Sequence, residues 1–208
     1  MPVHTTISTM RHAHTRYNAE KRYAGTIDIP LSPLGVRDAR KAAAKLAGAG
    51  FDVVVTSTQK RAYQTAEILV GNRVRILRNK LCNERRFGVM EGLTWDDIQT
   101  LDPPILMIRV GADLHTVNPR GGEPFEEVWE RAKKFRRFVF EKYAGSDVLV
   151  VSHGVFLQMF HGVLRGLNCI EALASYPANL EMARFRFVGR RLADEEVVGL
   201  SDAVLFKW

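Results

Sequence analysis

Cysteine is scarce in this chain, and no long apolar stretch interrupts it. Only two cysteines, Cys82 and Cys169, occur in 208 residues, and neither belongs to a CxxC pair. A disulfide framework and a cysteine-based zinc site are therefore not expected. No run of about 18 uncharged apolar residues occurs, so no membrane-spanning helix is predicted. The first residues also lack the apolar segment of a secretory signal, so a cytoplasmic protein is expected.

Internal repeats, low-complexity tracts and linker-like segments are absent as well. The length of 208 residues and the hydrophobic content of 46% are typical of one globular chain rather than a disordered one. We therefore expect a single domain spanning residues 1–208. The sequence does not determine the oligomeric state, although a predicted edge strand near the C-terminus offers a place where two copies could pair.

Positively charged residues are in excess in this chain. The 30 Lys and Arg residues outnumber the 23 Asp and Glu residues, which gives a formal net charge of +7. This balance suits an anionic partner such as a phosphorylated metabolite. The basic residues concentrate in two groups, which are Lys133, Lys134, Arg136 and Arg137, and Arg184, Arg186, Arg190 and Arg191. Both groups are interpreted as solvated faces, and because no nucleic-acid-binding motif is present, no nucleic-acid partner is expected.

Short β-branched segments alternate with helical ones along most of the chain. Strands are predicted at residues 5–10, 51–56, 74–77 and 147–152, helices at 33–47, 59–70, 124–143 and 155–164, and edge strands at 181–188 and 197–200. This alternation predicts an α/β fold of three α/β/α layers, with a mainly parallel central sheet and helices on both faces. Residues 102–123 are weakly patterned and are interpreted as a partly helical excursion over one face of the sheet.

Chemically active side chains concentrate just after the first predicted strand, in the run Arg11-His12-Ala13-His14-Thr15. A histidine beside an arginine suits phosphoryl transfer, because imidazole can act as a nucleophile and guanidinium can bind phosphate oxygens. His153 follows the fourth strand, and Arg61 lies in the first turn of the helix after the second. If these three strands are neighbours, the side chains meet at one edge of the sheet.

Four separated motifs stand in order along the chain. They are Arg11-His12-x-x-Thr15-x-x-Asn18, Ser57-x-x-x-Arg61-Ala62-x-x-Thr65-Ala66, Leu81-x-x-Glu84-x-x-Phe87-Gly88-x-x-Glu91-Gly92, and Ser152-His153-Gly154. Together with Gly25-x-x-Asp28-x-Pro30-Leu31 and Gly121-Gly122-Glu123, they closely resemble the histidine phosphatase superfamily, which has the phosphoglycerate-mutase-like fold. The resemblance covers about residues 5–190.

The resemblance implies a role for each matching residue. His12 is the expected nucleophile, which forms a phosphohistidine, and Glu84 is the expected general acid and base. Arg11, Arg61 and His153 are expected to hold the transferred phosphoryl group, so neither a metal nor another cofactor is implied. The expected substrate-binding residues are Asn18, Thr15, Gly154 and His14. One difficulty arises at Glu84, because a general acid needs a raised pKa, whereas nearby guanidiniums would lower it.

The chain departs from the family pattern at two positions. Ala13 stands where glycine is usual, and it either occupies a positive φ at a cost of roughly 1 kcal/mol or adds a methyl group at the edge of the pocket. His14 stands where glutamate or glutamine is usual, and it either offers a donor to the substrate or points outward. Both differences leave the catalytic groups in place and leave the substrate open.

The leading hypothesis is a metal-independent phosphatase acting on small phosphomonoesters. The alternative within the fold is a 2,3-bisphosphoglycerate-dependent phosphoglycerate mutase, but such mutases typically carry a longer basic excursion over the site. Here the excursion, at about 93–123, is short and offers only Arg109, His115 and Arg120. Two hypotheses from other classes are a non-catalytic phosphate-binding module and a metal-dependent hydrolase that uses His12, His14 and His153.

Overall fold

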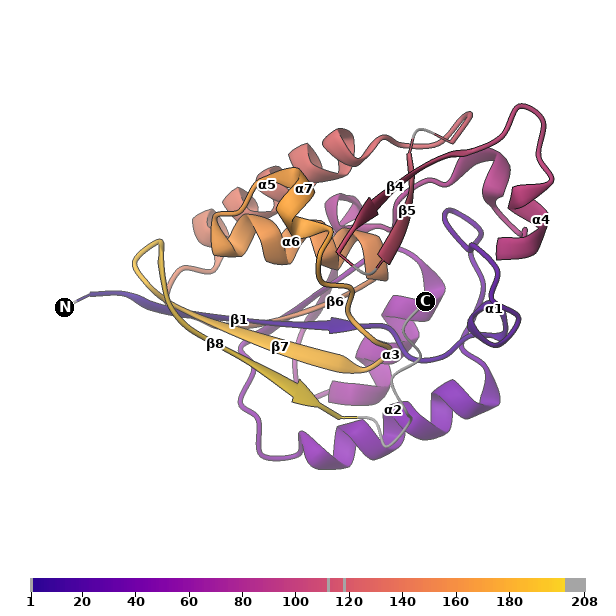
Figure 1. Ribbon diagram of the computed structural model, residues 1–208. Helices are drawn as coiled ribbons and strands as arrows, with labels where there is room; N and C mark the ends of the chain where they lie inside the picture. Colours follow the sequence, from indigo (N-terminus) through magenta and orange to yellow (C-terminus); the bar gives the residue numbers. More distant parts are fainter. Residues whose placement is uncertain (1, 112, 118, 201–208) are drawn as a thin grey trace.

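A computed structural model describes residues 2–111, 113–117 and 119–200, and a six-stranded sheet runs through its centre (Figure 1). Its strands are β1 (His4–Arg11), β2 (Val53–Thr56), β3 (Ile76–Arg78), β6 (Asp147–Ser152), β7 (Glu181–Val188) and β8 (Arg191–Gly199). The order is β3-β2-β6-β1-β7-β8, and the first four of these strands are parallel. The predicted mainly parallel sheet is therefore confirmed, and β1 and β2 both flank β6.

Two further strands pair antiparallel on the β1 side of the sheet. The segment predicted as one edge strand, β7, lies inside the sheet between β1 and β8. On this side of the sheet, only β8 forms the edge. That part of the prediction was wrong because β8 begins at Arg191, earlier than the predicted 197, and covers β7 along its whole length. The run of three consecutive acids from Asp194 to Glu196 hid this strand from the hydrophobic pattern.

Helices cover both faces of the sheet. On one face lie α5 (Phe125–Lys142) and α6 (Gly154–Arg165), and on the other lie α2 (Pro33–Lys45) and α3 (Lys60–Val70) (Figure 1). Successive residues of a strand point to opposite faces, so Val148 and Val150 pack under α5 and α6 while Leu149 and Val151 face α2 and α3. The three predicted layers are thus built on two apolar cores.

Short elements complete the chain. They are α1 (Arg16–Ala19), η1 (Lys80–Cys82), η2 (Gly88–Met90), α4 (Trp95–Gln99), β4 (Leu106–Val110), β5 (Asp113–Val117) and α7 (Cys169–Ala172). Among the described residues, none of the helices is both long enough and apolar enough to cross a membrane.

The excursion contains a hairpin rather than a helix between residues 102 and 123. Strands β4 and β5 pair antiparallel, with Ile108 opposite His115, and the turn begins at Gly111, whose φ is +61°. The partly helical interpretation was therefore wrong. The physical reason is that apolar residues fill β4 except at Arg109, so the two-residue period of a strand is not evident in the sequence. The hairpin turns the side chains of His115 and Thr116 inward, where both are buried.

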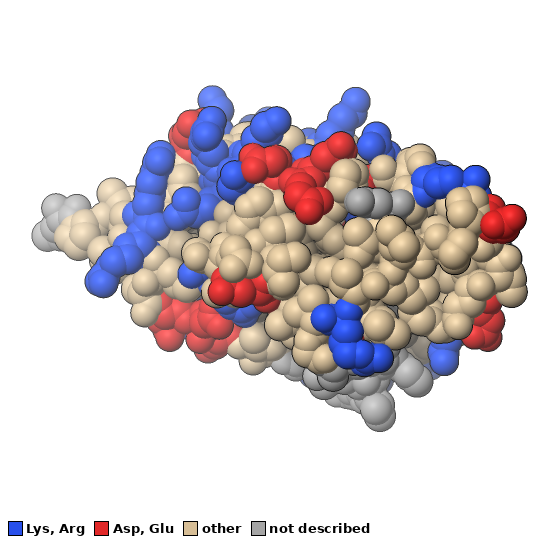
Figure 2. All heavy atoms as spheres, turned by 45° about the horizontal axis from the view of Figure 1, so that its top comes forward, with Lys and Arg blue, Asp and Glu red and all other residues tan. Residues whose placement is uncertain are grey.

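The basic residues are partly matched by acids. Figure 2 shows Lys and Arg side chains gathered over the left part of one face, with acidic side chains among and below them. Lys133 pairs with Glu130 on α5, with 2.6 Å between Nζ and Oε1. Across β7 and β8, Arg184 Nη1 lies 2.9 Å from Glu196 Oε1, and Arg186 pairs with the same carboxylate. These contacts fit solvated faces, as the sequence predicts.

Candidate active site

The carboxyl ends of β1 and β6 bring His12 and His153 together. The backbone N–H of His12 donates to Ser152 O at 2.9 Å, which continues the pairing of the two strands past their ends. As a result the two imidazole centroids lie 5.1 Å apart, with the ring planes at 58°. Arg61 reaches the same point from the first turn of α3, and its Nε lies 3.2 Å from His153 Nδ1. The sequence predicted that these side chains meet if their strands are neighbours, and β2, β6 and β1 are indeed adjacent.

The His12 ring is held with one nitrogen free. Its Nδ1 lies 2.7 Å from Ala13 O, and because a carbonyl only accepts, Nδ1 carries the hydrogen. The other nitrogen, Nε2, then has its lone pair available. Burial, followed by the charges of Arg61 and Arg11, lowers the pKa of His12 well below its ordinary value. The ring is therefore neutral near pH 7, which is the state that a nucleophile requires.

His153 has the opposite tautomer. Arg61 Nε–H donates to its Nδ1, so the hydrogen of the neutral ring lies on Nε2. The pKa of His153 is also well below its ordinary value, first because of burial and then because of Arg61. Its Nε2 is buried and has no hydrogen-bond partner among the described residues. A buried donor without a partner is costly, so this atom is ready to bind an anion.

The two arginines are fixed by backbone carbonyls. Arg61 donates from Nη1 to Ile27 O at 3.0 Å and from Nη2 to Gly25 O at 2.9 Å. Burial is the main cause that lowers its pKa to about 10, which leaves it charged at neutral pH. Arg11 Nη1 donates to Pro177 O at 3.0 Å, while its buried Nε has no partner in the described part of the chain. Two unpartnered donors, Arg11 Nε and His153 Nε2, thus belong to side chains beside His12.

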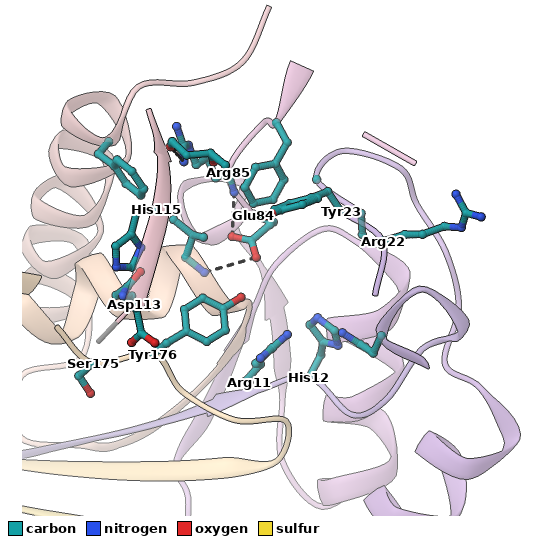
Figure 3. Close-up of a pocket in the computed structure, with 18 of the residues that line it drawn as sticks. Arg11, His12, Arg22, Tyr23, Glu84, Arg85, Asp113, His115, Ser175 and Tyr176 are labelled. Carbon is teal, nitrogen blue, oxygen red and sulfur yellow. Dashed lines mark hydrogen bonds between the residues drawn. The ribbon is translucent and has the colours of Figure 1, made fainter. Parts of the chain in front are cut away.

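The carboxyl group of Glu84 lies next to the first residues of α6, across the cavity from His12 (Figure 3). Its Oε1 accepts from the backbone N–H of Phe156 at 3.2 Å and of Arg85 at 2.9 Å, and its Oε2 accepts from Val155 N–H at 3.4 Å. Free N–H groups at a helix start stabilise a carboxylate. The backbone therefore orients the carboxyl group.

The arginines that follow Glu84 point in different directions. Arg86 pairs with Glu127 at the surface, with 3.6 Å between Nη2 and Oε2. Arg85 is buried, and its Nη1 donates to Thr116 O at 2.9 Å. Of the two, only Arg85 lies along the wall of the cavity that His12 and Glu84 share.

The four expected substrate-binding residues divide into two pairs. Thr15 and Asn18 both line the cavity, and they cap α1 for each other, since Asn18 Oδ1 accepts from Thr15 N–H at 2.9 Å. His14 and Gly154 do not line it. A Cβ at Gly154 would lie 2.0 Å from Tyr176 Oη, so this glycine is needed for the close approach of Tyr176.

Neither expectation for Ala13 fits the structure. Its φ is not positive, and its fully buried side chain belongs to the core under α2 and α3 rather than to the cavity edge. The Ala13 N–H donates to Thr65 Oγ1 at 3.0 Å, which ties the loop after β1 to α3. The methyl group is therefore a packing feature, and it leaves the pocket unchanged.

The cavity has a volume of about 380 Å³, and several residues that line it do not belong to the sequence motifs. Tyr23, Arg85, His115, Gln158 and Tyr176 all line it. Arg85 is the neighbour of Glu84, and His115 was named from the sequence as a residue of the excursion, but neither was given a role at the cavity. Gln158 and Tyr176 carry no sequence signal, because a single polar residue in an apolar helix and a tyrosine in a loop are both common. In the described part of the chain, no group of at least three His, Cys, Asp or Glu side chains is placed to hold a metal ion.

Comparisons with known proteins agree with this geometry. The family model "Histidine phosphatase superfamily (branch 1)" matches residues 7–193. Phosphoserine phosphatase 1 of Hydrogenobacter thermophilus is 29% identical over 160 residues, which cover 76% of this chain and 75% of that protein. A 2,3-bisphosphoglycerate-dependent phosphoglycerate mutase of Methylorubrum extorquens is 30% identical over 168 residues, which cover 76% and 78%.

Among solved structures, YhfR of Bacillus stearothermophilus superimposes with a TM-score of 0.78 at 27% identity. The superposition covers 91% of this chain and 94% of that one. The similarity therefore extends over nearly the whole fold and not only over the residues at the strand ends.

Proposed function

The chain belongs to the histidine phosphatase superfamily, and from this premise we propose that it hydrolyses small phosphomonoesters without a metal ion, through a phosphohistidine on His12. One observation carries the proposal: the free Nε2 of His12 lies beside two side chains with unpartnered donors, Arg11 Nε and His153 Nε2. A nucleophile beside donors for phosphoryl oxygens is what phosphoryl transfer requires.

In the first step, Arg11, Arg61 and His153 hold the phosphoryl oxygens while His12 Nε2 attacks phosphorus. The new N–P bond forms as the bond to the leaving oxygen breaks, and charge that develops on the phosphoryl oxygens is stabilised by the surrounding donors. Glu84, which faces the cavity, gives its proton to the leaving alcohol. His153 contributes as a neutral hydrogen-bond donor, because Arg61 fixes its tautomer.

In the second step, water replaces the alcohol. Glu84, now a carboxylate, takes a proton from the water as its oxygen attacks phosphorus, and the N–P bond breaks. The products are inorganic phosphate and a free His12. Glu84 must be protonated when substrate arrives, and we propose that the negative charge of the bound phosphoryl group favours this state against the nearby arginines.

The alternative is a phosphoglycerate mutase, in which a second phosphoglycerate replaces the water. The Methylorubrum extorquens relative carries that name, so the alternative has support of its own. The feature that favours hydrolysis is the short excursion, where a pair of five-residue strands, β4 and β5, stands over the cavity. A mutase must keep water away from its phosphohistidine, and a short hairpin offers little cover for that purpose.

The test measures phosphate release from p-nitrophenyl phosphate in the presence of EDTA. Wild type and His4→Ala, whose altered histidine is exposed on β1, are expected to be active, whereas His12→Ala is expected to be inactive. Acid-quenched enzyme from labelled substrate should contain phosphohistidine in the first two proteins only. Equal activity of His12→Ala would overturn the proposal. Interconversion of 2- and 3-phosphoglycerate with added 2,3-bisphosphoglycerate, faster than phosphate release, would favour the mutase.

A further inference from the structure

Three buried polar atoms in the cavity wall have no hydrogen-bond partner among the described residues, and their side chains are not part of the phosphoryl-transfer site. They are Arg85 Nη2, His115 Nε2 and Gln158 Oε1. The residues are 1%, 9% and 1% exposed. Figure 3 shows Arg85 and His115 across the cavity from His12. Unpartnered buried polar atoms are costly, so this end of the cavity is suited to a polar ligand group.

Arg85 offers one nitrogen that has no hydrogen-bond partner among the described residues. Its Nε donates to Glu123 O at 2.7 Å and its Nη1 donates to Thr116 O at 2.9 Å. Its guanidinium carbon lies 3.9 Å from the ring centroid of Phe125, so the plane of the group is held by stacking as well. Nη2, with its two N–H groups, is the nitrogen left without a partner in the described part of the chain, and its direction is fixed by these contacts.

Gln158 and His115 offer acceptors, and the backbone of Leu173 orients both. Gln158 Nε2 donates to Leu173 O at 2.8 Å, which leaves its Oε1 as an acceptor. Burial is the main cause that lowers the pKa of His115, although Asp113 and a hydrogen bond with the Leu173 backbone oppose this shift. Because the buried Nε2 has no partner among the described residues, we assign this hydrogen bond to Nδ1. In the neutral ring, Nε2 therefore carries a lone pair.

This set of atoms discriminates between ligand groups. One donor nitrogen and two acceptors match hydroxyl groups, since each hydroxyl can accept from Arg85 and donate to His115 or Gln158. A carboxylate could accept from Arg85, but it would place its lone pairs against two further acceptors. An ammonium group could donate to the acceptors and would meet the Arg85 cation. An alkyl group would leave all three atoms unpartnered.

We infer that the alcohol part of the substrate is polyhydroxylated, and that Arg85, His115 and Gln158 bind its hydroxyl groups. The inference rests on the proposed function, because it assumes that the phosphoryl group lies beside His12. It adds the class of substrate, a polyol or sugar phosphate, and it assigns specificity to residues of α6, of the hairpin and of the segment after Glu84.

The test uses two pairs of phosphate esters that differ at one carbon. Glycerol 3-phosphate and 3-phosphoglycerate form the short pair, and sorbitol 6-phosphate and 6-phosphogluconate form the long pair. In each pair a terminal CH2OH replaces a carboxylate. We expect kcat/KM to favour the hydroxyl member of at least one pair by about tenfold or more. Equal turnover, or a preference for the carboxylate in both pairs, would overturn the inference.

A matched pair of variants locates the effect. Gln158→Met removes both polar atoms at similar volume, and it should lower the preference for the hydroxyl member by about tenfold. Gln99→Met makes the same change on α4, where the side chain is exposed, and should preserve the preference. If the preference survives Gln158→Met, the assignment fails. Should Gln158→Met not fold, His115→Phe tests the same end of the cavity.

The proposed function and this inference can fail separately. Turnover of p-nitrophenyl phosphate tests only the phosphoryl end of the cavity, because this ester has no hydroxyl group on its alcohol part. Activity on p-nitrophenyl phosphate without a preference for hydroxyl esters would overturn the inference alone. Absence of phosphate release from all five esters would contradict the proposed function, on which the inference depends.

Discussion

The two ends of the cavity are built in different ways. At the phosphoryl end, His12 and His153 stand at the ends of adjacent parallel strands, and short contacts to Ala13 and Arg61 fix their tautomers. At the opposite end, the groups come from a hairpin, from α6 and from the segment after Glu84. Under the two proposals, chemistry depends on groups at the strand ends and selectivity on groups from other elements, so substrate class can change while the reaction stays the same.

The largest change is expected at the phosphoryl end, in Glu84→Gln. Loss of the proton donor should lower kcat by about 100-fold or more for an alkyl phosphate such as glycerol 3-phosphate. The decrease should be smaller for p-nitrophenyl phosphate, since p-nitrophenolate leaves without a proton. Steady-state rates across a pH series measure both effects. An unchanged pH profile would show that Glu84 is not the general acid.

The next largest change is expected from a packing substitution at Gly154. Gly154→Ala should lower the free energy of unfolding by about 1–3 kcal/mol, because the new methyl group would collide with Tyr176. Urea unfolding measures the loss. Gly48→Ala is the matched control, since a Cβ there meets nothing within 4 Å. Equal stability of the two variants would mean that Tyr176 moves away at little cost.

The pH dependence of stability tests the two histidines of the phosphoryl end. His12 and His153 have pKa values well below 6.5 when folded, so below pH 6.5 the unfolded chain binds more protons. The free energy of unfolding should therefore fall with decreasing pH, by up to about 1.4 kcal/mol per pH unit for each histidine, and level off above this range. His153→Asn should reduce the decrease between about pH 7 and pH 5, as measured by urea unfolding. An identical decrease in the variant would contradict the prediction.

The smallest change is expected at His14, which lies outside the cavity. Its pKa is lowered by burial and then by the charge of Arg11, while Asp38 opposes the shift. We expect His14→Ala to change kcat/KM for any of the esters by less than about twofold. A tenfold loss for one ester would mean that substrate reaches beyond the cavity as it is described.

The sequence predicted the phosphoryl end more completely than the rest. His12 and His153 each follow a strand and Arg61 lies in the first turn of a helix, so topology brings these three near one another once the strand order is known. Glu84 stands in an irregular segment and was identified through the family resemblance. The strand order itself was not determined by the sequence. The local pattern also identified the buried strands, because short β-branched segments bounded by turn residues leave few alternatives.

The far end could not be predicted for a physical reason. His115 acts there only because β5 turns it inward, and Gln158 only because α6 places it opposite Leu173. Neither position can be recognised before the hairpin and the helix are placed in three dimensions. The excursion was interpreted as partly helical. The sequence therefore could not indicate which side chains of the hairpin face the cavity. Ala13 shows the converse, since a departure from the family pattern proved to be core packing.

The contact between Gly154 and Tyr176 also restricts how this protein can evolve. Any side chain at position 154 collides with the tyrosine, whereas replacement of the tyrosine by a smaller residue removes the obstacle. The two positions are therefore expected to show strong epistasis, so that their substitutions are tolerated in one order and rejected in the other. Tyr176 also lies close to the phosphoryl end, since its ring centroid is 5.0 Å from the Arg11 guanidinium carbon. A lineage that enlarges this cavity would therefore have to replace Tyr176 in the loop before it replaces Gly154 in α6.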